Sequence, residues 1–283
     1  MTRGNGGRPL LVATDLDGCL LDDSYSYEPA RPALAALSRE GVPLVLCSSK
    51  THGEMESLVR VLGLDSPFIV ENGGAIFIPT HQMPRAPGER AHDEPYTAIA
   101  LGTPRKVLVD ALSEISARTG VHVVGFAGLT PPELEKLTGL STAAAEQALR
   151  RAYDEPFLAE GGGEAAAAIA REASRRGLRV TRGGRFHHLT GHVDKGEALR
   201  RLLGVLAAAG RMYRTAALGD AANDLTMLQT VDRPIVVPLA DGRLDPILTA
   251  ALPQAERAPA PGPEGWNEAV LAVLRGQGLP TIV

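Results

Sequence analysis

The chain of 283 residues has few cysteines, few aromatic residues and little net charge, and each shortage excludes a class of protein. Its 2 cysteines cannot form the disulfide framework of a small secreted domain and fit a reducing cytoplasm. No apolar run approaches the roughly 20 residues that cross a bilayer, and no apolar signal-peptide region follows the polar N-terminal residues. A net charge of −4 argues against nucleic-acid binding by bulk electrostatics. We therefore expect a cytoplasmic protein with neither membrane nor nucleic-acid partners.

What the chain does have is an ordinary globular composition and a length that suffices for two domains. Short apolar strands alternating with helices predict an α/β fold with a doubly wound, Rossmann-like parallel sheet. From residue 79 to about residue 94 the composition shifts to Pro, Gly, His and Arg, which is typical of a linker. An α+β segment follows, opening with a strand at 96–101. We predict a core domain of residues 1–82 and 191–283, interrupted by an inserted α+β domain at 83–190.

The stretch that organises the chain reads LLVATDLDGCLL, from Leu10 to Leu21. Its apolar start predicts a strand buried on both faces. Asp15 and Asp17 follow at the carboxyl end of that strand, where open α/β sheets bind their ligands, and Gly18 permits a sharp turn. Two such like charges would raise one another's pKa, so we expect a cation or a shared proton beside them. The plainer interpretation is a strand that ends in an acidic turn.

A second acidic cluster follows a later strand. Residues 215–218 predict that strand, which leads into the sequence GDAAND. Asp220 stands directly after it, as Asp15 does after the first strand, and Asp224 begins a helix, where acidic residues are common. On adjacent parallel strands, the two clusters would make an oxygen-rich site suited to Mg²⁺.

Two helix starts carry residues that suit an anion. Ser48 ends a buried strand at 43–47 and precedes a helix N-terminus, where anions are stabilised; Thr51 and Glu54 predict a capping box for that helix. Lys195 begins another helix, where the helix dipole disfavours a cation. Its ammonium group therefore faces either solvent or an anion.

Other polar stretches allow a binding and a structural interpretation. Asn72 and Gly73, between two apolar runs, predict a hairpin first and part of a substrate site second. The arginines of RGGRFHH, at 182–188, suit a carboxylate or a phosphate, and the acids of YDEPF, at 153–157, suit sugar hydroxyls. Both stretches also fit a solvated turn with a salt bridge. The spacing of the three histidines near this turn, His187, His188 and His192, matches no zinc site.

Taken together, DLDGCL, the strand end at Ser48, Lys195 and GDAAND resemble the four motifs of the haloacid dehalogenase superfamily, in that family's order. The segment inserted between the second and third motifs resembles the cap domain of its sugar-phosphatase branch. The set CSSKT, ENGG, YDEPF, GGRFHH and PGPEGW resembles the mannosyl-3-phosphoglycerate phosphatase family. Cys19 stands where the superfamily usually has Thr or Val, and Ala221 where these enzymes often have Ser. Neither position should carry the chemistry.

This resemblance implies a Mg²⁺-dependent phosphatase acting on a small phosphorylated sugar-glycerate and releasing a compatible solute. Asp15 would be the nucleophile, Asp17 the general acid and base, and Ser48 and Lys195 would contact the phosphoryl group. It implies Mg²⁺ ligands among Asp15, Asp220 and the backbone carbonyl of Asp17, with Asn223 or Asp224 beside them. The candidate substrate-binding residues are Ser49, Lys50, Glu71, Asn72, Gly73, Asp154, Glu155, Arg182, Gly183, Gly184 and Arg185.

Three other functions stay open. The first is a phosphatase of another sugar phosphate, of the sucrose- or trehalose-phosphate type, and the second is a hexose-phosphate mutase. The third is a sugar-phosphate sensor without catalysis, which would show itself by the loss of a catalytic residue. The presence of Asp15, Asp17, Lys195 and Asp220 argues against the sensor.

Overall fold

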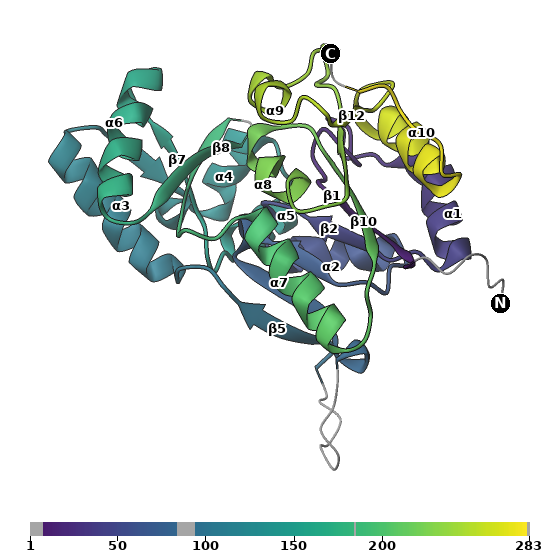
Figure 1. Ribbon diagram of the computed structural model, residues 1–283. Helices are drawn as coiled ribbons and strands as arrows, with labels where there is room; N and C mark the ends of the chain where they lie inside the picture. Colours follow the sequence, from purple (N-terminus) through teal and green to yellow (C-terminus); the bar gives the residue numbers. More distant parts are fainter. Residues whose placement is uncertain (1–7, 84–93, 184, 282–283) are drawn as a thin grey trace.

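The computed structural model describes residues 8–83, 94–183 and 185–281, which form two sheets with helices around them (Figure 1). The larger sheet has eight strands. In spatial order they are β12 (Glu256–Arg257), β11 (Arg233–Val236), β10 (Arg214–Gly219), β1 (Leu10–Thr14), β2 (Leu44–Cys47), β3 (Phe68–Val70), β4 (Ala75–Pro79) and β5 (Tyr96–Ala100). Pairing is parallel from β12 to β3 and antiparallel at β4 and β5. The predicted doubly wound core is confirmed.

Helices cover both faces of this sheet, so its central strands are buried on both sides, as their apolar sequences predict. One face packs against α1 (Arg31–Glu40), α2 (His52–Val61) and α10 (Gly262–Leu274). The other packs against α7 (Lys195–Ala208), α8 (Leu225–Leu228) and α9 (Pro246–Ala251). In β1, Val12 faces the first group, whereas Leu11 and Ala13 face the second. This alternation keeps β1 in the centre of the core, with its carboxyl end at the edge where ligands bind.

The smaller sheet is the cap, with four antiparallel strands: β6 (Val123–Gly125), β7 (Glu155–Ala159), β9 (Phe186–Thr190) and β8 (Arg179–Gly183). Its outer face carries α3 (Arg105–Thr119) and α6 (Gly162–Arg175), which pack on Phe157 and Leu189. Phe186 faces the opposite way, toward α4 (Pro131–Thr138) and α5 (Thr142–Leu149). In Figure 1 this second face looks toward the larger sheet.

Two segments differ from the sequence-based expectation. The strand expected to open the inserted domain is β5, and it extends the larger sheet because Ile99 pairs with Ile76 of β4. The last three residues of the stretch YDEPF form the start of β7, an interior strand of the cap sheet. Local sequence does not predict β7, because Pro156 disfavours an interior strand.

Predictions that depend on residues close together in the sequence are confirmed. Thr51 and Glu54 form the expected capping box of α2. β3 and β4 form the expected hairpin around Asn72, which adopts a left-handed conformation with a φ of 56°. Both cysteines are free and buried. Among the described residues, no helix has the length and apolar character needed to span a bilayer.

Candidate active site

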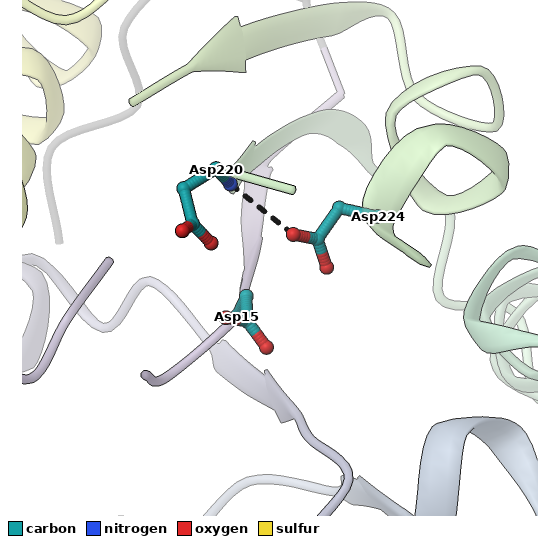
Figure 2. A group of neighbouring side chains, drawn as sticks. All are labelled: Asp15, Asp220 and Asp224. Carbon is teal, nitrogen blue, oxygen red and sulfur yellow. Dashed lines mark hydrogen bonds between the residues drawn. The ribbon is translucent and has the colours of Figure 1, made fainter. Parts of the chain in front are cut away.

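Three acidic side chains meet at the carboxyl edge of the larger sheet (Figure 2). Asp15 follows β1, and Asp220 follows β10, the parallel neighbour of β1. Asp224 ends the short 3₁₀ turn after β10 (Ala222–Asp224). Each carboxylate offers an oxygen within 4.8 Å of the others, and all three residues are buried. Parallel pairing of β1 and β10 is the reason that residues so distant in sequence converge here.

The backbone around Asp15 is fixed from two sides. Its N–H donates to the carbonyl of Leu218 in β10, at 2.9 Å. The Thr14 hydroxyl donates to the carbonyl of Asp15 at 2.8 Å and accepts from the buried indole N–H of Trp266, also at 2.8 Å. Gly18 has a φ of 79°, and a Cβ there would lie 2.7 Å from Oδ2 of Asp220. Only glycine fits at this turn without displacing the Asp220 carboxylate.

Lys195 is the cation of the cluster. It is fully buried, and its Nζ donates to Oδ1 of Asp15 at 2.5 Å and to Oδ1 of Asp224 at 2.7 Å. Asp194 caps α7 by accepting from the N–H of Glu197, which fixes the helix start that carries Lys195. Burial alone would lower the pKa of Lys195, but the two carboxylates raise it well above its usual value. Of the two orientations left open by the sequence, the ammonium group faces anions.

If all three acids of the cluster were ionised, their negative charge would exceed the charge of Lys195. Burial raises the pKa of Asp15 to about 7 although Lys195 opposes the shift, and burial with Asp15 and Asp224 nearby raises the pKa of Asp220 to about 9. Asp224 is held by the backbone N–H groups of Asp220 and Ala221 at 3.1 and 3.2 Å. A buried group of carboxylates with only one ammonium between them suits a further cation, and oxygen donors favour a hard divalent metal. The cluster is therefore a candidate metal site.

A second ion pair lies beside the cluster. Nζ of Lys50 donates to both carboxylate oxygens of Asp17, at 2.8 and 3.0 Å, and lies 4.7 Å from the ring centroid of Tyr25. Asn223 donates to the side-chain oxygen of Asn72 at 3.5 Å. Lysine and carboxylate groups thus stand together at the mouth of the site.

These residues open into a cleft of about 820 Å³ between the larger sheet and the cap. From the core, its lining includes Asp15, Asp17, Ser49, Lys50, Asp220 and Asn223. From the cap, it includes Phe126, Arg151, Arg185, Phe186 and His188. One wall thus carries acids and Lys50, and the other carries arginine, histidine and aromatic rings.

Comparison with known proteins agrees with this geometry. Residues 12–85 match the model of the haloacid dehalogenase-like hydrolases. A glucosyl-3-phosphoglycerate/mannosyl-3-phosphoglycerate phosphatase of Methanococcoides burtonii is 39% identical, over 93% of this chain and 97% of the relative. One from Persephonella marina is 36% identical, over 94% and 97%. The mannosyl-3-phosphoglycerate phosphatase of Pyrococcus furiosus is 35% identical, over 78% and 88%.

The chain belongs to the mannosyl-3-phosphoglycerate phosphatase family of haloacid dehalogenase-like hydrolases. Solved structures agree on the fold. A haloacid dehalogenase-like hydrolase from Bacteroides thetaiotaomicron aligns with a TM-score of 0.65 at 18% identity, over 94% of this chain and 100% of that one. A protein from Thermoplasma acidophilum aligns with a TM-score of 0.66 at 19% identity, over 93% and 97%.

Within this family fold, the strand-end residues lie at different depths. Ser49 and Lys50 line the cleft, whereas Ser48 is buried beneath them and its hydroxyl accepts from the N–H of Lys50 at 3.2 Å. Glu71 lies at the core–cap junction, where its carboxylate accepts from the backbone N–H groups of Ala152 and Tyr153.

The neighbours of Glu71 hold the same junction together. The N–H of Asn72 donates to the carbonyl of Ser48. A Cβ on Gly73 would lie 2.2 Å from the carbonyl oxygen of Asp194, so glycine permits this close approach to the start of α7. Residues 71–73 are not among those that line the cleft. They tie the strand end at Ser48 to the cap and to the helix of Lys195.

The cap candidates also divide. Arg185 lines the cleft and donates to the carbonyl of Thr138. Arg182 pairs across the sheet with His187, whose ring contacts Phe157, so it lies on the outer face with α3 and α6. The two arginines therefore do not form the expected pair around one ligand. Gly183 ends β8, and Gly184 lies outside the described residues.

The acids of YDEPF point into the cap. Glu155 is 1% exposed and bonds Arg105 at 2.7 Å and the N–H of Ala127 at 2.8 Å. Asp154 is fully buried and bonds Arg151 and His188. Neither acid lines the cleft, so the structure gives no support to their direct contact with sugar hydroxyls.

Sequence reasoning missed Arg151 and His188 as cleft residues. Arg151 stands two residues before the YDEPF stretch, in a segment with no pattern that marks it. From the sequence, His188 is a candidate only for a metal site, which the histidine spacing does not match. The signal that would have found both is charge complementarity: each lies one hydrogen bond from a buried acid of the same stretch.

Proposed function

We propose that this protein is a Mg²⁺-dependent phosphatase that hydrolyses mannosyl-3-phosphoglycerate, and its glucosyl counterpart, to the glycosylglycerate and phosphate. The observation that carries the proposal is the buried Asp15, paired with Lys195 and facing a cleft shared by core and cap. The names of the relatives that match almost the whole chain support the substrate. The product is a small neutral sugar joined to an acid, which has the chemistry of a compatible solute.

The first step uses Asp15 and Asp17. Asp15 attacks phosphorus in line, an O–P bond forms, and the bond from phosphorus to the glycerate oxygen breaks. Asp17 lines the cleft beside Asp15 and gives its proton to the leaving oxygen. For that it must part from Lys50, and an anionic substrate that binds the ammonium of Lys50 releases it.

The second step restores the enzyme. Asp17 takes a proton from a water molecule, whose oxygen attacks the phosphorus of the aspartyl-phosphate. The bond from phosphorus to the Asp15 oxygen breaks, which releases phosphate and restores the Asp15 carboxylate. Lys195 offsets the charge of Asp15 throughout, and the cap excludes bulk water from the cleft. The Ser49 and Lys50 loop faces the phosphate from the core side.

Asp15 and Asp220 are the residues that would hold Mg²⁺, because both oxygens of Asp224 already accept hydrogen bonds. We expect Asp224 to fix the loop of Asp220, with Asn223 at its side. When bound, Mg²⁺ adds the positive charge that allows a phosphate dianion to approach a carboxylate.

Added Mg²⁺ should therefore raise the midpoint of thermal unfolding, because a ligand that binds only the folded state stabilises it by about 2.7 kcal/mol at a hundred times its Kd. Differential scanning fluorimetry with and without Mg²⁺ measures this shift without any substrate. Asp220→Asn should remove most of it. Asp110→Asn, which changes an exposed acid of α3, should keep it. An equal Mg²⁺ shift in Asp220→Asn and the parent would rule out this metal site.

The substrate is tested by phosphate release from a panel of sugar phosphates. The purified protein should act on mannosyl- or glucosyl-3-phosphoglycerate with a kcat/KM at least about 10-fold above those for sucrose 6-phosphate and trehalose 6-phosphate. Preference for either sugar phosphate, which lacks the glycerate carboxylate, would contradict the proposal. A new sugar phosphate without free phosphate would indicate a mutase.

A further inference from the structure

On the cap side of the cleft, one buried carboxylate holds two cleft residues. Oδ2 of Asp154 accepts from Nη1 of Arg151 at 3.0 Å and contacts Nδ1 of His188 at 2.7 Å. The Asp154 side chain is 0% exposed, and those of Arg151 and His188 are each 7% exposed. Arg151 and His188 line the cleft, whereas Asp154 does not. The acid therefore stands behind its two partners, away from any ligand.

Two of the three residues share one connection, and the third comes from a strand of the cap sheet. Arg151 lies in the connection after α5, Asp154 directly precedes β7, and His188 lies on β9, paired with Pro156 of β7. Side chains alternate along a strand, so His188 faces the cleft while His187 faces α3 and α6. The sheet register thus brings His188 over Asp154.

Arg151 also joins the cap to the core. The same Nη1 donates to the carbonyl of Ser49 at 2.9 Å, and the guanidinium lies 5.6 Å from the ring centroid of Phe126. Ser49 lines the cleft beside Lys50, at the edge where the phosphate is expected. The guanidinium is thereby held close to the phosphate end of a bound substrate.

In the cap cluster of Arg151, Asp154 and His188, hydrogen bonding is incomplete. Nε of Arg151 and Oδ1 of Asp154 are buried and have no hydrogen-bond partner among the described residues. Buried polar atoms are rarely left unpaired, and where they are, a role in function is one explanation. Fold stability alone does not account for an arrangement that leaves both an acid and its arginine partly unpaired.

The cap cluster has the chemistry of a carboxylate-binding site. A guanidinium matches the planar carboxylate with parallel N–H groups. When Nδ1 of His188 donates to Asp154, Nε2 is the nitrogen left for a ligand, and a protonated ring donates from it. Arg185 adds positive charge to the same wall of the cleft. No acidic residue of the cap lines the cleft among the residues that the structure describes.

We propose that Asp154 is a positioning residue that orients Arg151 and His188 to bind the carboxylate of the glycerate unit. This proposal rests on the proposed function, since it names the part of that substrate which the cap recognises. It replaces Arg182 with Arg151 as the arginine that works with Arg185. The sugar then faces the remaining lining of the cleft, where Phe126 and Phe186 stand in edge-to-face contact.

The test compares Asp154→Asn with the parent enzyme on two simple esters, 3-phosphoglycerate and glycerol 3-phosphate, which differ by the carboxylate. We expect the kcat/KM for 3-phosphoglycerate divided by that for glycerol 3-phosphate to fall about 10-fold or more in Asp154→Asn, since a charge-assisted contact with the carboxylate is lost. On mannosyl-3-phosphoglycerate, the KM should rise about 10-fold or more while kcat changes less than about 3-fold. Glu172→Gln, a buried acid of the cap paired with arginines on α6, is the control and should leave the ratio unchanged.

Two further variants keep the proposal testable if Asp154→Asn does not fold. Arg151→Lys and His188→Gln leave the buried carboxylate in place, and each should lower the same ratio. An unchanged ratio in all soluble variants would overturn the proposal. So would a higher KM for mannosyl-3-phosphoglycerate with the ratio unchanged, because the cluster would then bind the sugar. If the parent enzyme does not hydrolyse mannosyl-3-phosphoglycerate, the proposed function fails, and the two esters still test the carboxylate-binding site.

Discussion

Asp15→Asn is expected to lower kcat by at least about 10⁴-fold, because loss of a catalytic nucleophile has effects of that size or larger. Asn has nearly the same volume and keeps an oxygen that can accept from Lys195, so the fold should persist. Its amide cannot form the bond to phosphorus. Phosphate release from mannosyl-3-phosphoglycerate measures the loss, and calorimetric titration with the same compound should still detect binding.

Asp110→Asn serves again as the control, since it changes an exposed acid of α3 and should keep full activity. An Asp15→Asn protein with near-normal turnover would refute the covalent mechanism. A protein that unfolds would be detected by circular dichroism, and Asp15→Glu then takes its place, because it keeps the charge beside Lys195 but moves the attacking oxygen.

Lys195→Met should abolish activity and also destabilise the fold. Removing one partner of a buried ion pair leaves uncompensated charge, at a cost of roughly 3–5 kcal/mol in the free energy of unfolding. In this variant Asp15 and Asp224 lose their shared cation. Chemical denaturation, followed by tryptophan fluorescence from Trp266, measures the change.

The cause of the stability lost in Lys195→Met can be identified from how the loss depends on pH and on Mg²⁺. Carboxyls with raised pKa values bind protons in the folded state before they do in the unfolded state, so their protonation favours folding as the pH falls. The deficit of Lys195→Met should therefore be smaller at mildly acidic pH than at neutral pH, and Mg²⁺ should restore part of the stability at neutral pH. Lys106→Met removes an exposed lysine of α3 and should change neither property. An unaltered free energy of unfolding in Lys195→Met would contradict the view that Lys195 neutralises the acids.

Much of the fold was predictable because its signals are local or periodic. Buried parallel strands such as β1 read as short apolar runs, and the capping box of Thr51 with Glu54 involves only neighbouring residues. The strand β5 was expected to open the inserted segment, and it pairs with β4 of the larger sheet. The sequence of a single strand does not specify which strand it pairs with.

The acidic part of the candidate site was also predictable in outline. Acids that end two neighbouring parallel strands lie at one edge of the sheet, so the sequence could predict that Asp15 and Asp220 lie together. The role of Asp224 was less clear, because its contact with Lys195 depends on how α7 is placed. A sequence shows that a lysine starts a helix, but the packing of that helix decides what the ammonium meets.

The cap side of the cleft was not predictable to the same degree. The sequence RGGRFHH predicts a turn between two strands. Which of its side chains face the cleft depends on which face of the cap sheet α3 and α6 cover. That choice sends His188 and Arg185 inward and Arg182 outward. The sequence likewise allows Asp154 and Glu155 to be sugar ligands, whereas in the structure each bonds an arginine of the cap.

The sequence by itself determined the class of fold, the strand ends that carry the acids, and the order of motifs that marks the family. It could do so because strand burial, helix capping and the positions of acids at strand ends are properties of short segments. Only the tertiary structure decided that Lys195 is buried between two acids and that Arg151 and His188 share one carboxylate. Apart from the contact of Arg151 with Asp154 within one short connection, those contacts join residues from separate elements. Their partners follow from sheet register and helix packing, which no short segment specifies.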